Sequence, residues 1–300
     1  MLAQSIMPPW GWYTALYYWL ASVASFMFAA AFLGSLVRYE HAWAVRWSIR
    51  LAGPVAILAL LTEALELGNP GTLYWIFSNL SSPIAINAAT ASVFIVFSLA
   101  YAFLPWRSTA PQRYVMGALG WIATAAAVIW LVGRIDLLIS AATRPFWAAA
   151  STPALLLISS VMVGLGALVF ISGLGALARK GGALNNVMRL SSIVAACILA
   201  LAFVLGTQIA GALEGEETLT RSAAMLIYGA SSGAFWMAAM VGFVVPGIIY
   251  VIQYVFKGLM SDNARYIALA LASALVIVGI LILYGAIISV GLRAPIPGEV

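Results

Sequence analysis

Apolar runs long enough to cross a lipid bilayer fill most of this chain. A membrane-spanning helix needs ~20 mostly apolar residues, and eight stretches of this kind follow one another along the sequence. They are Trp12–Val37, Ile49–Leu67, Pro83–Leu104, Tyr114–Ile139, Pro153–Ala178, Leu190–Leu213, Ala223–Phe256 and Ala264–Leu292. The pattern predicts an all-α integral membrane protein with eight transmembrane helices, folded as one polytopic membrane domain over residues 1–300.

The seventh stretch is too long for a single straight span. Its 34 residues would reach about 51 Å at ~1.5 Å per residue, well beyond the hydrocarbon core. We therefore expect a break near Ser231, Ser232 and Gly233 or a kink at Pro246, with the excess lying at the membrane interface.

The few charged residues, 8% of the chain, alternate between the two sides. The connections after spans 1, 3, 5 and 7 hold ten basic residues and two acids, a sum of +8, whereas the other side holds four basic residues and seven acids, a sum of −3. Short basic loops stay in the cytoplasm. The charges predict a multi-pass protein of the cytoplasmic (inner) membrane with both termini extracytoplasmic (N-out/C-out), and the basic loops explain the high pI without any nucleic-acid partner.

The composition also limits the cofactors. The chain is 64% hydrophobic and has one cysteine, Cys197, and one histidine, His41. A membrane-embedded haem of the b type needs two axial histidines, and an iron–sulphur cluster needs several cysteines. We expect no haem, no iron–sulphur cluster and no metal site in this chain, so that redox chemistry would come from a ligand in the membrane or from partner subunits.

Two segments resemble the NrfD/PsrC family, the membrane subunits of polysulphide reductase-like respiratory oxidoreductases. Residues 66–70 read Glu-Leu-Gly-Asn-Pro and are followed by an Asn…Ser-Pro stretch at 78–88, similar to the family's acidic-Leu-Gly-x-Pro element. Residues 144–147 read Arg-Pro-Phe-Trp and lead into Thr-Pro at 152–153, similar to its Arg-Pro-x-Trp…Pro pattern. The chain departs from the family in having Glu66 where Asp is usual and Leu131 in place of the tyrosine of a Tyr-x-Gly element.

This resemblance implies a haem-free subunit of eight helices arranged as two four-helix bundles. It also implies a bound quinone (menaquinone-type or similar). The partners it implies are an iron–sulphur (ferredoxin-like) subunit on the outer face and, beyond it, a molybdopterin-type catalytic subunit.

Ionisable residues near the outer ends of spans 2 and 4 are the candidates for a quinone site. Glu63 and Glu66 are three residues apart and share a helix face, whereas Arg134 and Asp136 are two apart and point in different directions. Ionisable groups inside a span are costly and commonly functional.

A quinone needs donors for its two carbonyl oxygens and a proton carrier. We expect Glu66 or Asp136 to carry protons, and Arg134 or a tyrosine of the first helix (Tyr13 or Tyr17) to hold the ring oxygens.

Three alternatives stay open on the sequence. Glu66 and Arg134 could form a purely structural ion pair, with Tyr13 and Tyr17 as interfacial anchors. The chain could be a small-solute transporter, which predicts discontinuous helices near the midplane. It could also be an anchor that tethers other subunits and binds no quinone.

Overall fold

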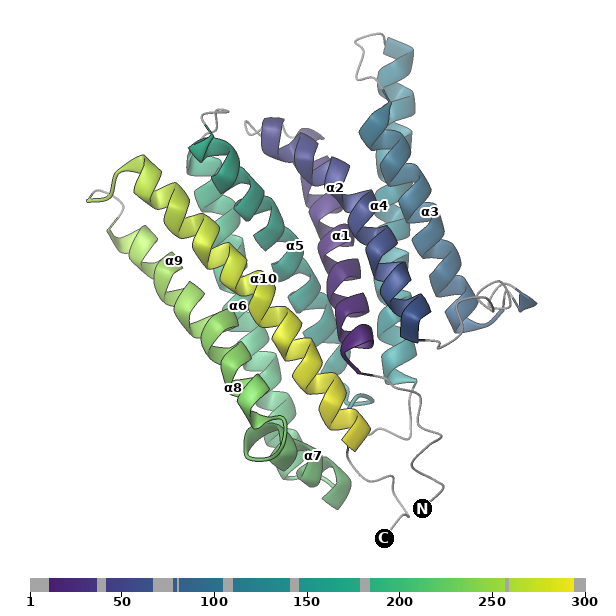
Figure 1. Cartoon of the computed structure of the whole chain (residues 1–300), viewed down its shortest axis with the longest axis vertical. Coiled ribbons are helices and arrows are strands. Elements are labelled where there is room, and N and C mark those ends of the chain that lie inside the picture. The colour runs from purple at the N-terminus through teal and green to yellow at the C-terminus, as the bar shows by residue number, and fades with distance from the viewer. Residues whose placement is uncertain are drawn as a thin grey trace.

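Helices make up almost all of the described chain. The computed structural model describes residues 11–36, 42–66, 78–79, 81–104, 110–140, 146–178, 184–256 and 259–293 (Figure 1). Its helices are α1 (Trp12–Leu36), α2 (Ala42–Glu66), α3 (Pro83–Phe103), α4 (Ala110–Ile139), α5 (Thr152–Leu177), α6 (Leu184–Leu213), α7 (Glu217–Ile227), α8 (Ser232–Ala239), the π-helical turn η3 (Met240–Val244), α9 (Val245–Val255) and α10 (Asp262–Arg293). Within these residues eight helical segments are long and apolar enough to span a membrane. The prediction of an all-α protein with eight spans is confirmed.

The spans form two bundles that lie side by side (Figure 1). Helices α1 to α4 pack together as the first bundle, and α5, α6, the α8–η3–α9 segment and α10 pack as the second. Helix α1 contacts both α5 and α10, so that α1 and α5 form the junction between the bundles. We call the end at which α1, α3 and α5 begin the acid-rich end and the opposite end the basic end, after the charges that the sequence places there.

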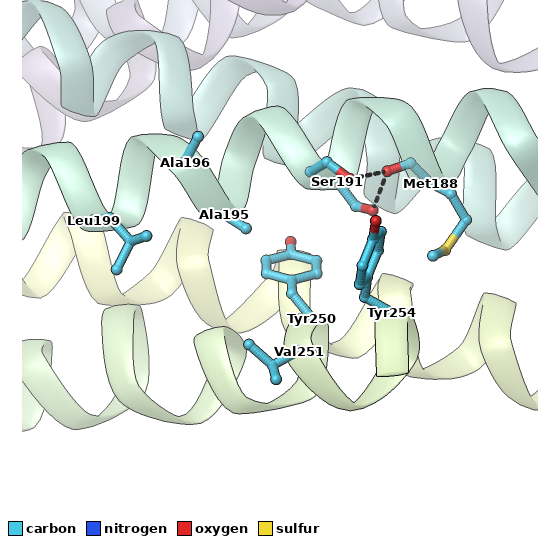
Figure 2. Close-up of a pocket in the computed structure, with 9 residues that line it drawn as sticks. Met188, Ser191, Ala195, Ala196, Leu199, Tyr250, Val251 and Tyr254 are labelled. Carbon is cyan, nitrogen blue, oxygen red and sulfur yellow. Dashed lines mark hydrogen bonds between the residues drawn. The ribbon is translucent and has the colours of Figure 1, made fainter. Parts of the chain in front are cut away.

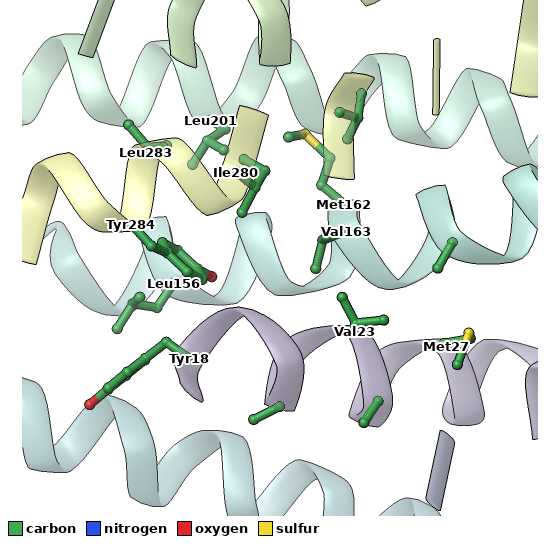
Figure 3. Close-up of a cluster of buried hydrophobic side chains, with 14 of the residues drawn as sticks. Tyr18, Val23, Met27, Leu156, Met162, Val163, Leu201, Ile280, Leu283 and Tyr284 are labelled. Carbon is green, nitrogen blue, oxygen red and sulfur yellow. The ribbon is translucent and has the colours of Figure 1, made fainter. Parts of the chain in front are cut away.

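The junction has an apolar core. Figure 3 shows Tyr18 and Val23 of α1 beside Leu156 of α5 and Tyr284 of α10, and all four side chains are buried. At Gly164 of α5, an added Cβ would lie 2.7 Å from the backbone carbon of Phe26 and 2.8 Å from the backbone nitrogen of Met27. Close backbone approach at small residues is the usual way in which transmembrane helices pack, and here it joins the two bundles.

The long seventh stretch is divided where the sequence predicted. Helix α7 ends at Ile227 and α8 begins at Ser232, so the excess length forms a separate short helix that turns away from the axis of α8 (Figure 1). Farther along, the backbone N–H of Val245 donates to the carbonyl of Met240, which is the five-residue spacing of a π turn. The turn lies directly before Pro246, which has no N–H to donate, and π turns of this kind locally re-space a helix.

Two helices begin six or seven residues earlier than their apolar stretches. Helix α2 begins at Ala42 rather than Ile49, and α6 begins at Leu184 rather than Leu190. In both cases the extra turns contain arginine, namely Arg46 in α2 and Arg189 in α6. A long arginine side chain can extend along the helix to the interface, so the helix continues past the purely apolar stretch.

Candidate functional site

A buried guanidinium group lies near the acid-rich end of the first bundle. Arg134 of α4 is 1% exposed, and its Nη1 donates to the backbone carbonyl of Tyr18 (2.9 Å) and to Ser22 Oγ (3.2 Å) on α1. The hydroxyl of Tyr18 in turn donates to the backbone carbonyl of Arg134 at 2.8 Å. One turn earlier on α4, the ring of Trp130 lies with its centroid 5.1 Å from Arg134 Cζ, a cation–π distance. These contacts fix the guanidinium between α1 and α4.

The remaining donors of Arg134 have no partner. Neither Nε nor Nη2 makes a hydrogen bond, and among the described residues no carboxylate lies within ion-pair distance of this side chain. Of the described residues, Arg134 is also the only charged one whose side chain is buried. Leaving a buried charge and its N–H groups unpaired is costly, so the arrangement suits a ligand that brings hydrogen-bond acceptors.

A second set of polar groups surrounds the hydroxyl of Tyr17, which is 3% exposed. This hydroxyl accepts hydrogen bonds from Asn87 Nδ2 of α3 (2.6 Å) and from Trp130 Nε1 of α4 (3.1 Å). The carboxyl group of Glu63, on α2, interacts with this tyrosine. All four helices of the first bundle therefore meet at one tyrosine.

Asn87 also carries a free acceptor. Its Oδ1 has no hydrogen-bond partner although the residue is 1% exposed. A Cβ added at Gly133 would lie 3.0 Å from this oxygen, so Asn87 packs closely against the glycine of α4. The site thus contains free donors on Arg134 and a free acceptor on Asn87.

Glu66, the last residue of α2, contacts the beginning of α1. Its carboxylate accepts from Thr14 Oγ1 and from the backbone N–H of Gly11, at the beginning of α1. A carboxylate at this position satisfies free N–H groups and complements the positive end of the helix dipole. The expected alternative of a Glu66–Arg134 ion pair is not observed.

The structure does not bring the other two predicted residues to Arg134. Asp136 is exposed on another face of α4, as the two-residue spacing implied. Tyr13 is 48% exposed on the surface of α1. Of the predicted residues, therefore, Arg134 and Tyr17 lie within the network of buried polar groups, Glu66 lies beside it, and Asp136 and Tyr13 lie outside it.

A comparison with protein families agrees with the fold. The model of the family described as "Polysulphide reductase, NrfD" matches residues 2–292, nearly the whole chain. The chain belongs to the NrfD family. No curated protein matches it. This NrfD protein is therefore a multi-pass membrane subunit by both its family and its eight spans.

Part of the sequence resemblance falls outside the described residues of this NrfD protein, namely 67–77, 80 and 144–145. The described part of the Arg-Pro-Phe-Trp motif holds helices of the second bundle. The carbonyl of Phe146 accepts from Gln208 Nε2 of α6 (3.2 Å), and Trp147 Nε1 donates to the carbonyl of Ile287 of α10 (3.1 Å). These two motif residues thus have a structural role.

Sequence reasoning missed most of the neutral partners in the site. Tyr18, Ser22, Asn87 and Trp130 do not stand out in apolar helices rich in aromatic and small residues. Two signals could have found some of them. Trp130 lies four residues before Arg134, on the same helix face, and Asn87 lies inside the Asn…Ser-Pro stretch that carries the resemblance.

Proposed function

We propose that this NrfD protein is the quinone-binding membrane subunit of a respiratory oxidoreductase, with its quinone held in the first bundle near Arg134. The observation that carries the proposal is the pair of free N–H donors on a buried, unpaired guanidinium. The two oxygens of a quinone ring are hydrogen-bond acceptors, and charged donors form the stronger hydrogen bonds in proteins. Inside the membrane no water is at hand to accept hydrogen bonds from these N–H groups when a ligand is absent.

The residues fit both redox forms of a quinone, which when bound supplies two-electron, two-proton chemistry. Arg134 would hold a ring oxygen through Nε or Nη2. The free Oδ1 of Asn87 would accept from a hydroxyl of the reduced form. Glu63, which interacts with Tyr17, would take up or release the proton, in place of the Glu66 or Asp136 expected from the sequence. Glu66 would stabilise the beginning of α1.

The orientation and the partners belong to the same proposal. The difference between the two sides, +8 against −3, supports an extracytoplasmic acid-rich end with both termini on that side. Electrons would pass between the quinone and an iron–sulphur subunit docked there, and from it to a molybdopterin-type catalytic subunit. The exposed acids Glu214, Glu216 and Glu217 offer this partner a negatively charged surface.

The structure of the second bundle does not favour the transporter alternative. A transporter is expected to have a discontinuous helix near the midplane with polar groups at the break. The π turn η3 does lie inside the seventh span, but its residues, Met240–Val244, are apolar, and Gly242 packs closely against Gly279 of α10. The buried Arg134 and the half-buried Glu63 and Glu66 lie instead at the acid-rich end of the first bundle.

The test is the quinone content of the purified chain. Arg134→Gln removes the charged donors but keeps a polar side chain, and hydrogen bonds to charged groups contribute ~1.5–3 kcal/mol, so we expect quinone affinity to fall about tenfold to a hundredfold. Arg221→Gln is the matched control, because Arg221 is an exposed arginine that pairs with Glu217 on α7. Equal quinone content in wild type and both variants would contradict the proposed site.

The partners are tested separately. Extraction in mild detergent, followed by mass spectrometry of the proteins that stay bound, should identify an iron–sulphur subunit. A chain that purifies alone while retaining quinone would contradict the proposed partners and leave the quinone site standing.

A further inference from the structure

A groove lies between α6 and α9 in the second bundle, away from the polar site. It has a volume of about 350 Å³. Figure 2 shows the side chains of α6 facing those of α9 across it. Its lining is mostly apolar and comprises Met188, Ser191, Ser192, Ala195, Ala196 and Leu199 of α6 with Tyr250, Val251 and Tyr254 of α9.

The groove covers the depth of one membrane leaflet. It starts at Met188, four residues after the beginning of α6 at the basic end, and reaches Leu199. At ~1.5 Å per residue this is about 16 Å along the helix, roughly half of the ~30 Å hydrocarbon core. It therefore runs from the interface to the bilayer midplane, which is the depth that one acyl chain occupies.

Both serine hydroxyls and the Tyr250 hydroxyl of the lining already have partners. The hydroxyls of Ser191 and Ser192 both donate to the carbonyl of Met188, at 2.8 and 2.9 Å, and the Tyr250 hydroxyl is hydrogen-bonded to Ser273 Oγ at 3.0 Å. In contrast to the site at Arg134, the groove offers a ligand apolar surface. An occupant that is a hydrocarbon chain fits this lining.

Next to the end of the groove the chain carries an arginine and a tyrosine. Arg189, which directly follows Met188, is exposed, and Tyr254 at the end of α9 is 70% exposed. Tyrosine and arginine are typical of the headgroup level, and a basic residue there attracts anionic lipid. From depth, lining and charge together, we propose that this groove binds one acyl chain of an anionic phospholipid of the leaflet at the basic end, with Arg189 at its headgroup.

Native mass spectrometry of the delipidated chain, titrated with phosphatidylglycerol or with phosphatidylcholine of the same acyl chains, tests the proposal. Wild type should retain one phosphatidylglycerol in preference to phosphatidylcholine. Ala196→Trp fills the groove and should abolish tight retention of both lipids, whereas Ala210→Trp, an exposed alanine near the other end of α6, should behave as wild type. Arg189→Gln should lower the preference for phosphatidylglycerol about fivefold, as expected for ~1 kcal/mol per basic residue, while Arg50→Gln on α2 should not.

The proposal is overturned if Ala196→Trp retains as much lipid as Ala210→Trp. A photoreactive residue in place of Val251, activated in native membranes, adds a direct readout that does not depend on the stability of the tryptophan variant. A lipid adduct is expected, and an adduct with another polypeptide would overturn the proposal. The quinone site is unaffected by either outcome.

Discussion

The buried polar groups of the two bundles differ in their charge and in their hydrogen bonding. In the second bundle the buried polar side chains are neutral and several pair with each other, as in Ser159 with Tyr284 (2.7 Å) and Ser231 with Ser289 (2.8 Å), although Oε1 of Gln208 and of Gln253 has no partner. In the first bundle a positive charge is buried, and two of its donors remain free. Neutral pairs of this kind hold transmembrane helices together, whereas an unpaired charge does not. The difference indicates that the second bundle is built for packing and the first for a ligand.

The largest expected effect is on proton transfer in the first bundle. Glu63→Gln keeps the shape of the side chain beside Tyr17 but cannot carry a proton. We expect the quinone-linked turnover of the assembled complex to fall about 10²-fold or more, the usual effect of losing a general acid–base group. Asp136→Asn, an exposed acid on α4, should leave turnover nearly unchanged. Equal effects of the two changes would show that Glu63 has no special role.

The next prediction tests whether Arg134 binds a ligand or stabilises the fold, because the two roles predict different stabilities when it is replaced. Arg134→Met removes a buried charge whose free N–H groups are costly to leave unpaired. We expect thermal unfolding in detergent to shift upward or stay unchanged while quinone binding is lost. In the second bundle, Gln208→Met leaves the Phe146 carbonyl without its donor and should destabilise by about 1 kcal/mol. A large loss of stability in Arg134→Met would instead mark the arginine as structural.

At the junction, Gly164→Ala places a Cβ against the backbone of α1. Overpacking of this kind costs ~1–3 kcal/mol, and here it should loosen the contact between the bundles. Gly206→Ala on α6 is the matched control, since nothing lies within 4 Å of the added carbon, and it should be neutral or slightly stabilising. Thermal unfolding measured by circular dichroism gives both values, and equal stabilities would show that the junction is less tight than described.

The smallest effect concerns Glu66. If its role is to stabilise the beginning of α1 through Thr14 and Gly11, Glu66→Gln should lower stability by only ~0.3–1 kcal/mol and leave turnover close to wild type. A loss of turnover comparable to that of Glu63→Gln would restore Glu66 as a proton carrier.

Much of the fold could be predicted because transmembrane helices are specified by length and hydropathy. The eight spans and the break after α7 follow from residues that are local in the sequence. The rotation of each helix about its axis is not local, because apolar residues cover nearly every face of these spans. The sequence could therefore place Arg134 at the acid-rich end but could not show that it faces Tyr18 and Ser22 rather than Glu66.

The same limit applies to the two acids of α2. Glu63 and Glu66 share a face of α2, as predicted, yet one contacts Tyr17 in the bundle and the other caps α1. Three residues are about 4.5 Å of helix rise, enough to separate the buried network from the helix end. Only the positions of the neighbouring helices decide which carboxylate reaches which partner.

The most direct measurement is a cryo-electron microscopy map of the purified complex with a menaquinone analogue. We predict ring density in the first bundle, within hydrogen-bond distance of the free N–H groups of Arg134 and on the side where Asn87 Oδ1 and Glu63 lie. Density for the ring elsewhere, with Arg134 paired to a carboxylate of this chain or of a partner, would contradict the proposed site.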